Sequence, residues 1–319
     1  MVRGSAGAAS KLILLGEHAV VYGECALAVP LRRPRAEAAV SKAPAGRPVA
    51  VELEDFGIRW NGRSRPVPPE VRSFARIIAA AAERFPQIPA RGWKLSVRSQ
   101  IPSGCGLGSG TAVSAAAFRA IFRAFRVPYT ERIVSELVYE IEKLHHGNPS
   151  GIDNTVISMG RPILFRRGAA PRVITVPRKP CFFIVGHTGK RHSTAAVVAA
   201  VARARSGRRA EYDAIFRSIG RLSKRGARAF EQGHWRELGK LMDRNQELLE
   251  RLGVSSPELD ALVGAARSAG TLGAKLSGAG RGGCMAALTT DPACARRARR
   301  ALQAAGAVAT FVTRISNHG

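Results

Sequence analysis

The chain has 319 residues, of which 45% are hydrophobic, and its formal net charge at pH 7 is +27. This length allows one large domain or two packed ones, and the apolar content excludes global disorder. No apolar run approaches the roughly 20 residues that a membrane-spanning helix needs. The apolar patch at 12–15 is also too short for the core of a signal peptide. We therefore expect a cytoplasmic protein without a membrane partner.

The positive charge comes mostly from arginine and is spread along the whole chain. Binding to nucleic acid would explain it, and so would solvated helix faces with an arginine bias. Aromatic residues make up only 6% of the chain, so stacking surfaces for single strands are scarce. The sequence contains no zinc-finger, RNA-recognition or basic-zipper pattern. We expect no specific nucleic-acid partner, although weak binding to polyanions at low salt follows from the charge.

The cysteines are odd in number, and no two of them have the C-x-x-C spacing. A disulfide framework or a zinc site is therefore not expected. The sequence instead predicts that most of them are small buried apolar residues: Cys25, Cys105, Cys181, Cys284 and Cys294.

The first half of the chain mixes strands and helices. Short apolar or alternating runs predict strands, and 3.6-residue periodicity predicts helices. The expected strands are 11–15, 25–29 and 93–97, and the expected helices are 70–85, 109–125 and 130–146. Thr130 is the expected N-cap of the last helix and Gly147 its expected terminator.

The second half begins with an apolar strand at 181–185 and continues with three or four helices between about 193 and 268. Short strands at 273–276 and 284–288, a helix at 292–305 and a strand at 307–313 follow. A proline-rich stretch near 176–180 separates the halves. We therefore expect two α+β lobes with a cleft between them, residues 1–177 and 178–319.

A glycine-rich segment at 101–112 reads I-P-S-G-C-G-L-G-S-G-T-A. Glycine allows close approach of a ligand to the backbone, and the amides of a following helix N-terminus attract anions. This favours a phosphate-binding loop, with a purely structural turn as the alternative. The segment is neither a P-loop, because no Gly-Lys-Ser/Thr follows, nor a G-x-G-x-x-G dinucleotide fingerprint.

Three ordered segments resemble the motifs of the GHMP kinases. They read S-K-L-I-L-L-G-E-H-A-V-V-Y-G near the start, P-S-G-C-G-L-G-S-G in the loop, and K-L-S-G-A-G-R-G-G-C near the end. The resemblance implies a two-lobed α+β fold with a ribosomal-protein-S5-domain-2-like N-terminal lobe and a ferredoxin-like C-terminal lobe. It also implies a kinase that uses ATP and Mg2+ to phosphorylate a hydroxyl group of a small molecule.

Residues 146–154 read H-G-N-P-S-G-I-D-N, which resembles the mevalonate-phosphorylating branch of the family. The implied reaction phosphorylates the C5 hydroxyl of mevalonate and gives 5-phosphomevalonate for isoprenoid synthesis. The alternatives are a kinase of the galactose, homoserine or phosphomevalonate type, and a catalytically impaired nucleotide-binding homologue. The family often forms dimers, so a homodimer is also implied as an option.

The resemblance assigns chemistry to individual residues. Asp153 follows a Pro-Ser-Gly turn, which predicts a helix start there. It matches the catalytic carboxylate, which accepts the proton of the attacking hydroxyl or orients that hydroxyl, and Lys11 matches a cation that compensates charge. Glu142 stands eleven positions before Asp153, as the magnesium-binding glutamate of the family does, and Ser109 is the expected second ligand. Outside the motifs, these residues would be interpreted as a helix-terminal aspartate, a surface lysine and an exposed glutamate.

Glu17, His18 and Thr194 match substrate-side positions, with a purely structural histidine as the alternative for His18. The residues expected to bind ATP are those of the loop: Pro102, Ser103, Gly104, Gly106, Leu107, Gly108, Ser109, Gly110 and Thr111.

Two positions depart from the family pattern. Gly110 stands where the family has a serine that helps to hold the metal, so Ser109, Thr111 or water must supply that oxygen. Arg281 interrupts the glycine run of the last motif, which is expected to form a tight turn near the phosphate loop. Its role stays open at this point.

Overall fold

The computed structural model describes residues 3–146, 149–190 and 193–317, without the side chains of Arg3, His145 and His146. The chain forms two compact units. The first unit comprises residues 1–10, 34–102 and 108–160, and the second comprises 11–33, 103–107 and 161–319. The long strands β1 (Arg3–Leu15) and β2 (Ala26–Lys42) contribute residues to both units. A lobe boundary at 177/178 stays a prediction.

The first unit contains a sheet built around β5 (Trp93–Ser99). The later half of β2 pairs antiparallel with it, and Ala38 lies opposite Val97. On the other side, β3 (Ala50–Leu53) pairs parallel with β5, and β4 (Ile58–Trp60) pairs antiparallel with β3. Residues of β2 in this unit alternate between buried and exposed, as expected of a strand with one packed face.

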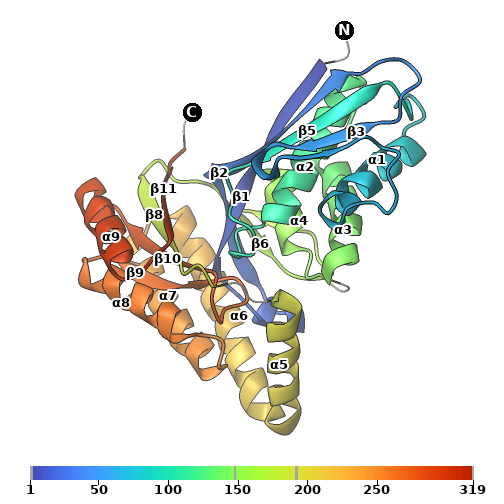
Figure 1. The fold of residues 1–319 in the computed structure, drawn as a ribbon. Coiled ribbons are helices and arrows are strands. Elements are labelled where there is room, and N and C mark those ends of the chain that lie inside the picture. The colour runs from blue at the N-terminus through green and yellow to red at the C-terminus, as the bar shows by residue number, and fades with distance from the viewer. Residues whose placement is uncertain (1–2, 147–148, 191–192, 318–319) are drawn as a thin grey trace. The chain divides into compact units, whose positions relative to one another are not determined.

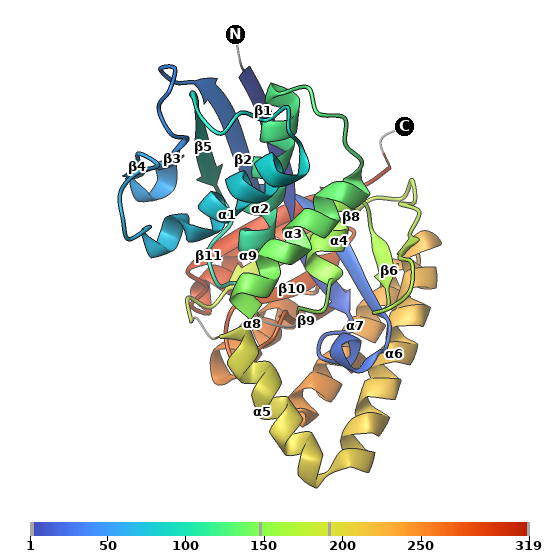
Figure 2. The ribbon, with the colours of Figure 1, turned by 90° about the vertical axis from the view of Figure 1, so that its right-hand side faces the viewer.

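Four helices accompany this sheet, and Figure 2 shows them gathered beside its strands. They are α1 (Arg72–Arg84), α2 (Ser109–Ala124), α3 (Glu131–His146) and α4 (Ile152–Met159). Helix α2 packs against β5 and against the other three helices, which explains why most of its side chains are buried. The three helices predicted in this half are confirmed. The hydroxyl of Thr130 accepts from the backbone N–H of Ile133 at 3.3 Å, whereas Gly147 lies outside the described residues.

The second unit contains a four-stranded antiparallel sheet in the order β11-β8-β10-β9. Its strands are β8 (Cys181–His187), β9 (Gly273–Ser277), β10 (Cys284–Thr289) and β11 (Ala309–Ile315). All four were predicted, and an antiparallel sheet covered by helices agrees with the expected C-terminal lobe. The short strands β6 (Ile163–Phe165) and β7 (Arg172–Val173) continue the pairing of the first residues of β2.

Five helices complete the second unit: α5 (Thr194–Gly207), α6 (Arg209–Glu231), α7 (Trp235–Arg251), α8 (Pro257–Ser268) and α9 (Pro292–Ala304). Helices α7, α8 and α9 pack against the sheet (Figure 1). Helices α5 and α6 meet in a V, which Figure 2 shows at its lower end. None of the described helices combines the length and the apolar character that crossing a membrane requires. All five cysteines are buried, as predicted.

Candidate functional site

The glycine-rich loop has a backbone conformation that requires glycine at several positions. Gly104, Gly106 and Gly108 have φ values of 72°, 81° and 73°, which side-chain-bearing residues rarely adopt. Gly108 is the N-cap residue of α2, and as a glycine it offers no side chain to cap that helix. Backbone amides at the start of α2 are therefore available to an anion.

Gly110 lies in the first turn of α2 and is exposed. A Cβ atom added there would meet no atom of the described residues within 4 Å. Neither packing nor backbone conformation requires glycine at this position. The departure from the family pattern therefore removes a hydroxyl without serving the fold.

The hydroxyl of Thr111 contacts the expected metal ligand directly. Its Oγ1 donates a hydrogen bond to Oε1 of Glu142, and both side chains are buried. Ser109 instead donates its hydroxyl proton to the carbonyl of Ile101 at 3.2 Å. Ser109 as a metal ligand stays a prediction, but the structure pairs Glu142 with Thr111.

Asp153 is the second residue of α4. This helix begins directly after Gly151, whose φ of 88° makes the sharp entry into it. The predicted position at a helix start is confirmed. The side chain is half-buried, and its negative charge at the N-terminus is stabilised by the helix dipole.

Buried polar contacts hold α4 in place. Asn154 donates from Nδ2 to the carbonyl and the hydroxyl of Ser135 on α3, at 3.1 and 2.9 Å. Arg119 of α2, 9% exposed, donates to the carbonyl of Ser158 at 2.6 Å and pairs with Glu131 at 2.5 Å. These bonds connect α2, α3 and α4, and they therefore hold the helix that carries the Asp153 carboxylate in a fixed position.

Lys11 lies in β1 within the second unit and is only 3% exposed. Its backbone N–H donates to the carbonyl of Leu107 at 3.0 Å, which ties the strand to the glycine-rich loop. A lysine buried to this extent is not a solvated surface group, because burying an ammonium group is expensive without compensating interactions. The structural setting therefore supports a functional interpretation of Lys11.

Glu17 is at the centre of a buried ionic cluster in the second unit. Lys275 of β9 pairs with its Oε1, and Asn245 of α7 donates to its Oε2 at 3.1 Å. Lys275 and Glu17 have 0% and 1% of their side chains exposed. Burial lowers the pKa of Lys275, and the neighbouring Glu17 carboxylate opposes that shift.

Sequence reasoning missed the partners of Glu17. Lys275 is the first residue of the third motif, K-L-S-G-A-G-R-G-G-C. Its place in that motif was the one feature of the sequence that could have indicated a functional lysine. Asn245 lies in the middle of α7, where nothing in the sequence distinguishes it from other polar helix residues. Only the packing of α7 against β9 brings it to Glu17.

His18 combines burial with an unusual backbone conformation, φ 59°. Its Nε2 donates to the carbonyl of Ala279 at 2.8 Å, so the proton of the neutral ring is on that nitrogen. Burial lowers the pKa of His18 below 6.5 and keeps the ring neutral at pH 7. A positive φ at a non-glycine residue is a form of strain that is concentrated at functional sites.

The last glycine motif forms the turn between β9 and β10. A Cβ on Gly106 would lie 3.0 Å from the carbonyl oxygen of Ser277, and one on Gly283 would lie 3.2 Å from that of Cys105. The turn is therefore packed near the glycine-rich loop, as predicted. Arg281 donates from its backbone N–H to Val254 O at 2.7 Å and from Nε to Gly253 O at 3.3 Å. Its role in the structure is to anchor this turn.

Thr194 is the first residue of α5 and is exposed, and Ser193 caps the helix by accepting from Ala196 N–H. Arg191 and His192, which precede this cap in the chain, lie outside the described residues. The substrate contact assigned to Thr194 stays a prediction. Within the described part of the chain, no group of three or more His, Cys, Asp or Glu side chains is arranged to hold a metal.

Comparisons with known proteins give the family. The N-terminal domain of the GHMP kinases matches residues 73–161, and the C-terminal domain of the GHMP kinases matches residues 227–308. The chain belongs to the GHMP kinase family. The resemblance seen in the sequence is thereby confirmed, and ATP is the phosphoryl donor that this kinase family uses.

Curated relatives match this GHMP kinase along almost its whole length. The mevalonate kinase of Thermococcus sibiricus is 35% identical over 335 residues, which covers 98% of this chain and 96% of the relative. The mevalonate kinase of Pyrococcus abyssi is 33% identical with the same coverage.

Solved structures agree on the fold. Leishmania major mevalonate kinase in complex with R-mevalonate has a TM-score of 0.85 and 25% identity, over 99% of this chain and 97% of that one. Lactococcus lactis galactokinase has a TM-score of 0.80 at 19% identity, over 99% and 94%. The second match shows the fold alone, which is the predicted two-domain GHMP kinase fold.

Proposed function

We propose that the protein transfers the γ-phosphoryl group of ATP to the C5 hydroxyl of mevalonate, forming 5-phosphomevalonate and ADP. The observation that carries this proposal is that curated mevalonate kinases match 98% of the chain at 33–35% identity. A mevalonate kinase with bound R-mevalonate has the same fold with a TM-score of 0.85.

In the proposed reaction, Asp153 accepts the proton of the C5 hydroxyl as that oxygen attacks the γ-phosphorus in line with the leaving ADP. Its rigid support on α4 favours precise orientation, on which phosphoryl transfer depends. Lys11 contributes a positive charge in a buried environment, where electrostatic stabilisation of a transition state is stronger than in water.

The residues present fit a magnesium ion. Glu142 offers a carboxylate and Thr111 a hydroxyl in direct contact with it, and a hard cation prefers oxygen ligands. Phosphate oxygens and water complete such sites in kinases, so a single protein carboxylate is sufficient. When bound, magnesium neutralises charge on the phosphates. We propose Glu142 as the metal ligand, with Thr111 at its side.

On the substrate side, we propose that Glu17, His18 and Thr194 bind mevalonate. Each oxygen of Glu17 accepts one hydrogen bond within the protein, and a carboxylate oxygen has a further lone pair for a substrate hydroxyl. His18 is neutral, with its Nε2 proton engaged, so Nδ1 is an acceptor for a substrate hydroxyl. The Glu17 cluster and the Ala279 carbonyl thus fix the two side chains in one orientation.

ADP release from the purified protein with ATP and magnesium tests the function, on a panel of mevalonate, 5-phosphomevalonate, galactose and homoserine. We expect release with mevalonate alone. Release with another member of the panel would identify that compound, and not mevalonate, as the substrate of this GHMP kinase. ATP binding without any release would support the catalytically impaired homologue, with the missing hydroxyl at Gly110 as its cause.

Replacing Thr111 by valine is expected to raise the magnesium concentration for half-maximal activity by about tenfold, because residues beside a metal ligand typically contribute 10- to 100-fold to affinity. The change keeps the shape of the side chain and removes only the hydroxyl that contacts Glu142. Magnesium titrations of the initial rate measure the effect.

Thr111→Ser keeps the hydroxyl and is the matched control, with an expected shift below about twofold. Ser109→Ala is expected to leave the magnesium dependence nearly unchanged, because the Ser109 hydroxyl donates to a backbone carbonyl. A larger shift for Ser109→Ala than for Thr111→Val would reverse this assignment and restore Ser109 as the ligand.

A further inference from the structure

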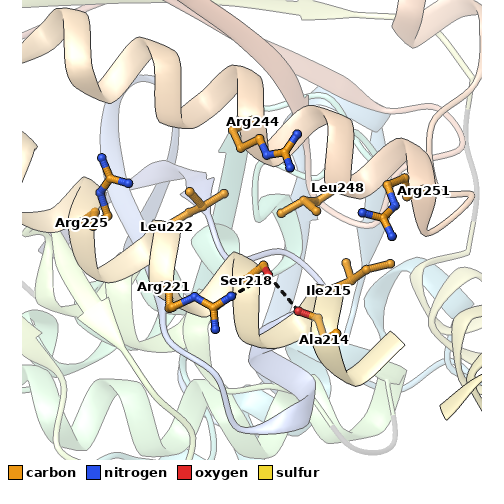
Figure 3. A pocket seen from close by; sticks show the side chains of 9 residues that line it. All are labelled: Ala214, Ile215, Ser218, Arg221, Leu222, Arg225, Arg244, Leu248 and Arg251. Atoms are coloured by element: carbon orange, nitrogen blue, oxygen red, sulfur yellow. Dashed lines mark hydrogen bonds between the residues drawn. The ribbon is translucent and has the colours of Figure 1, made fainter. Parts of the chain in front are cut away.

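The second unit has a hollow between α6 and α7 with a volume of about 300 Å³. None of the residues around it belongs to the glycine motifs or to the candidate catalytic and substrate residues. Figure 3 shows side chains of both helices surrounding this hollow, which we call the arginine pocket. Four arginines line it: Arg221, Arg225, Arg244 and Arg251.

The floor of the arginine pocket is apolar. Ile215, Leu222 and Leu248 line it and are only 2%, 9% and 3% exposed. In Figure 3 these three side chains lie between the arginines of the two helices. Leu248 follows Arg244 by four residues and precedes Arg251 by three, so all three share one face of α7. The pocket therefore offers an apolar surface surrounded by guanidinium groups.

The positive charge around the pocket is only partly compensated. Among the described residues that line it, none is acidic. Arg225 pairs with Glu237 at 3.3 Å and Arg244 pairs with Glu247, but both pairs are largely exposed and therefore weak.

Among the described residues, the other two arginines have no acidic partner. Arg221 donates to the Ser218 hydroxyl at 2.9 Å, and within the described part of the chain Arg251 has no ion-pair partner. Four like charges around one small hollow repel one another, and a bound anion would remove that repulsion.

We propose that the arginine pocket binds a small organic phosphate, a phosphomonoester dianion with an apolar body. Guanidinium groups match phosphate oxygens in bidentate geometry, and the apolar floor suits the organic part. A volume of about 300 Å³ is at the lower end for small-molecule sites, which favours a small molecule over a macromolecular partner.

Calorimetric titration with phenyl phosphate and with inorganic phosphate tests the proposal, at about 0.15 M ionic strength to suppress long-range attraction. Saturating ADP is present throughout, so that the nucleotide site is occupied. We expect one site that binds phenyl phosphate about tenfold more tightly than inorganic phosphate, because the ring buries apolar area on the floor. Equal affinities for the two anions would overturn the proposal.

Two double variants with equal net charge separate the pocket from the general surface. Arg221→Gln/Arg251→Gln changes the pocket, and Arg296→Gln/Arg300→Gln changes exposed arginines of α9. We expect phenyl phosphate to bind about tenfold more weakly to the pocket variant and within twofold of wild type to the α9 variant. Equal losses in both would assign the binding to surface charge. Binding of an acidic peptide at this pocket without binding of phenyl phosphate would assign it to a protein partner and overturn the proposal.

Discussion

Replacing Asp153 by asparagine is expected to lower kcat on mevalonate by about 10²- to 10⁴-fold, the usual range for loss of a positioned general base. The substitution keeps the size of the side chain and removes its ability to accept the hydroxyl proton. Because α4 is held by Asn154 and Arg119, the fold should be retained. Steady-state kinetics and circular dichroism of the variant measure both properties.

Asp260 provides a matched control, because it is also an aspartate in the first turn of a helix. Asp260→Asn removes the same charge from the N-terminus of α8 and should reduce stability by no more than about 1 kcal/mol. Its kcat should stay at the wild-type value. If Asp153→Asn behaved like Asp260→Asn, Asp153 would be a helix-stabilising residue and another group would be the base.

Replacing Lys275 by methionine is expected to lower the free energy of unfolding by about 3–5 kcal/mol, the typical effect of removing one member of a buried ion pair. Lys275 and Glu17 are almost completely buried, so the substitution would leave the Glu17 carboxylate without its cation. Denaturant titration followed by circular dichroism measures the loss. Activity should fall as well, because Glu17 would lose the partner that orients it.

The double variant Glu17→Gln/Lys275→Met removes both charges and is expected to recover a large part of the lost stability. The matched control is Lys190→Met, whose lysine lies 3.9 Å from Glu258 with 61% of its side chain exposed. That variant should change the stability by less than about 1 kcal/mol. Equal effects of Lys275→Met and Lys190→Met would mean that the buried pair contributes little to folding.

The helices and the glycine-rich loop were predictable because their signals are local. Helical periodicity, the cap at Thr130 and the glycine series each depend on residues close together in the sequence. The position of Asp153 in the first turn of α4 likewise followed from the Pro-Ser-Gly turn before it. Such features are determined by backbone conformation and capping, which neighbouring residues control.

The long strands were predicted only in part, since 11–15 and 25–29 are fractions of β1 and β2. Pro30 and Pro34 interrupt the apolar pattern of β2, and proline lacks the N–H that a strand ladder uses. In the structure, they lie between the residues that pair with β6 and those that pair with β5. Pairing with partners distant in the chain kept this strand continuous, and no local signal contains that information.

The sequence by itself determined the family, the glycine-rich loop, the expected catalytic carboxylate and its position at a helix start. These depend on short motifs whose residue types and spacing are those that the expected reaction requires. Tertiary structure alone decided which buried groups face one another: Thr111 with Glu142, and Glu17 with Lys275, which is 258 residues away. Likewise, only the packing of α6 against α7 gathers four dispersed arginines around one pocket. The physical reason is that burial and pairing energies depend on distances in space, which the order of residues along a chain does not specify.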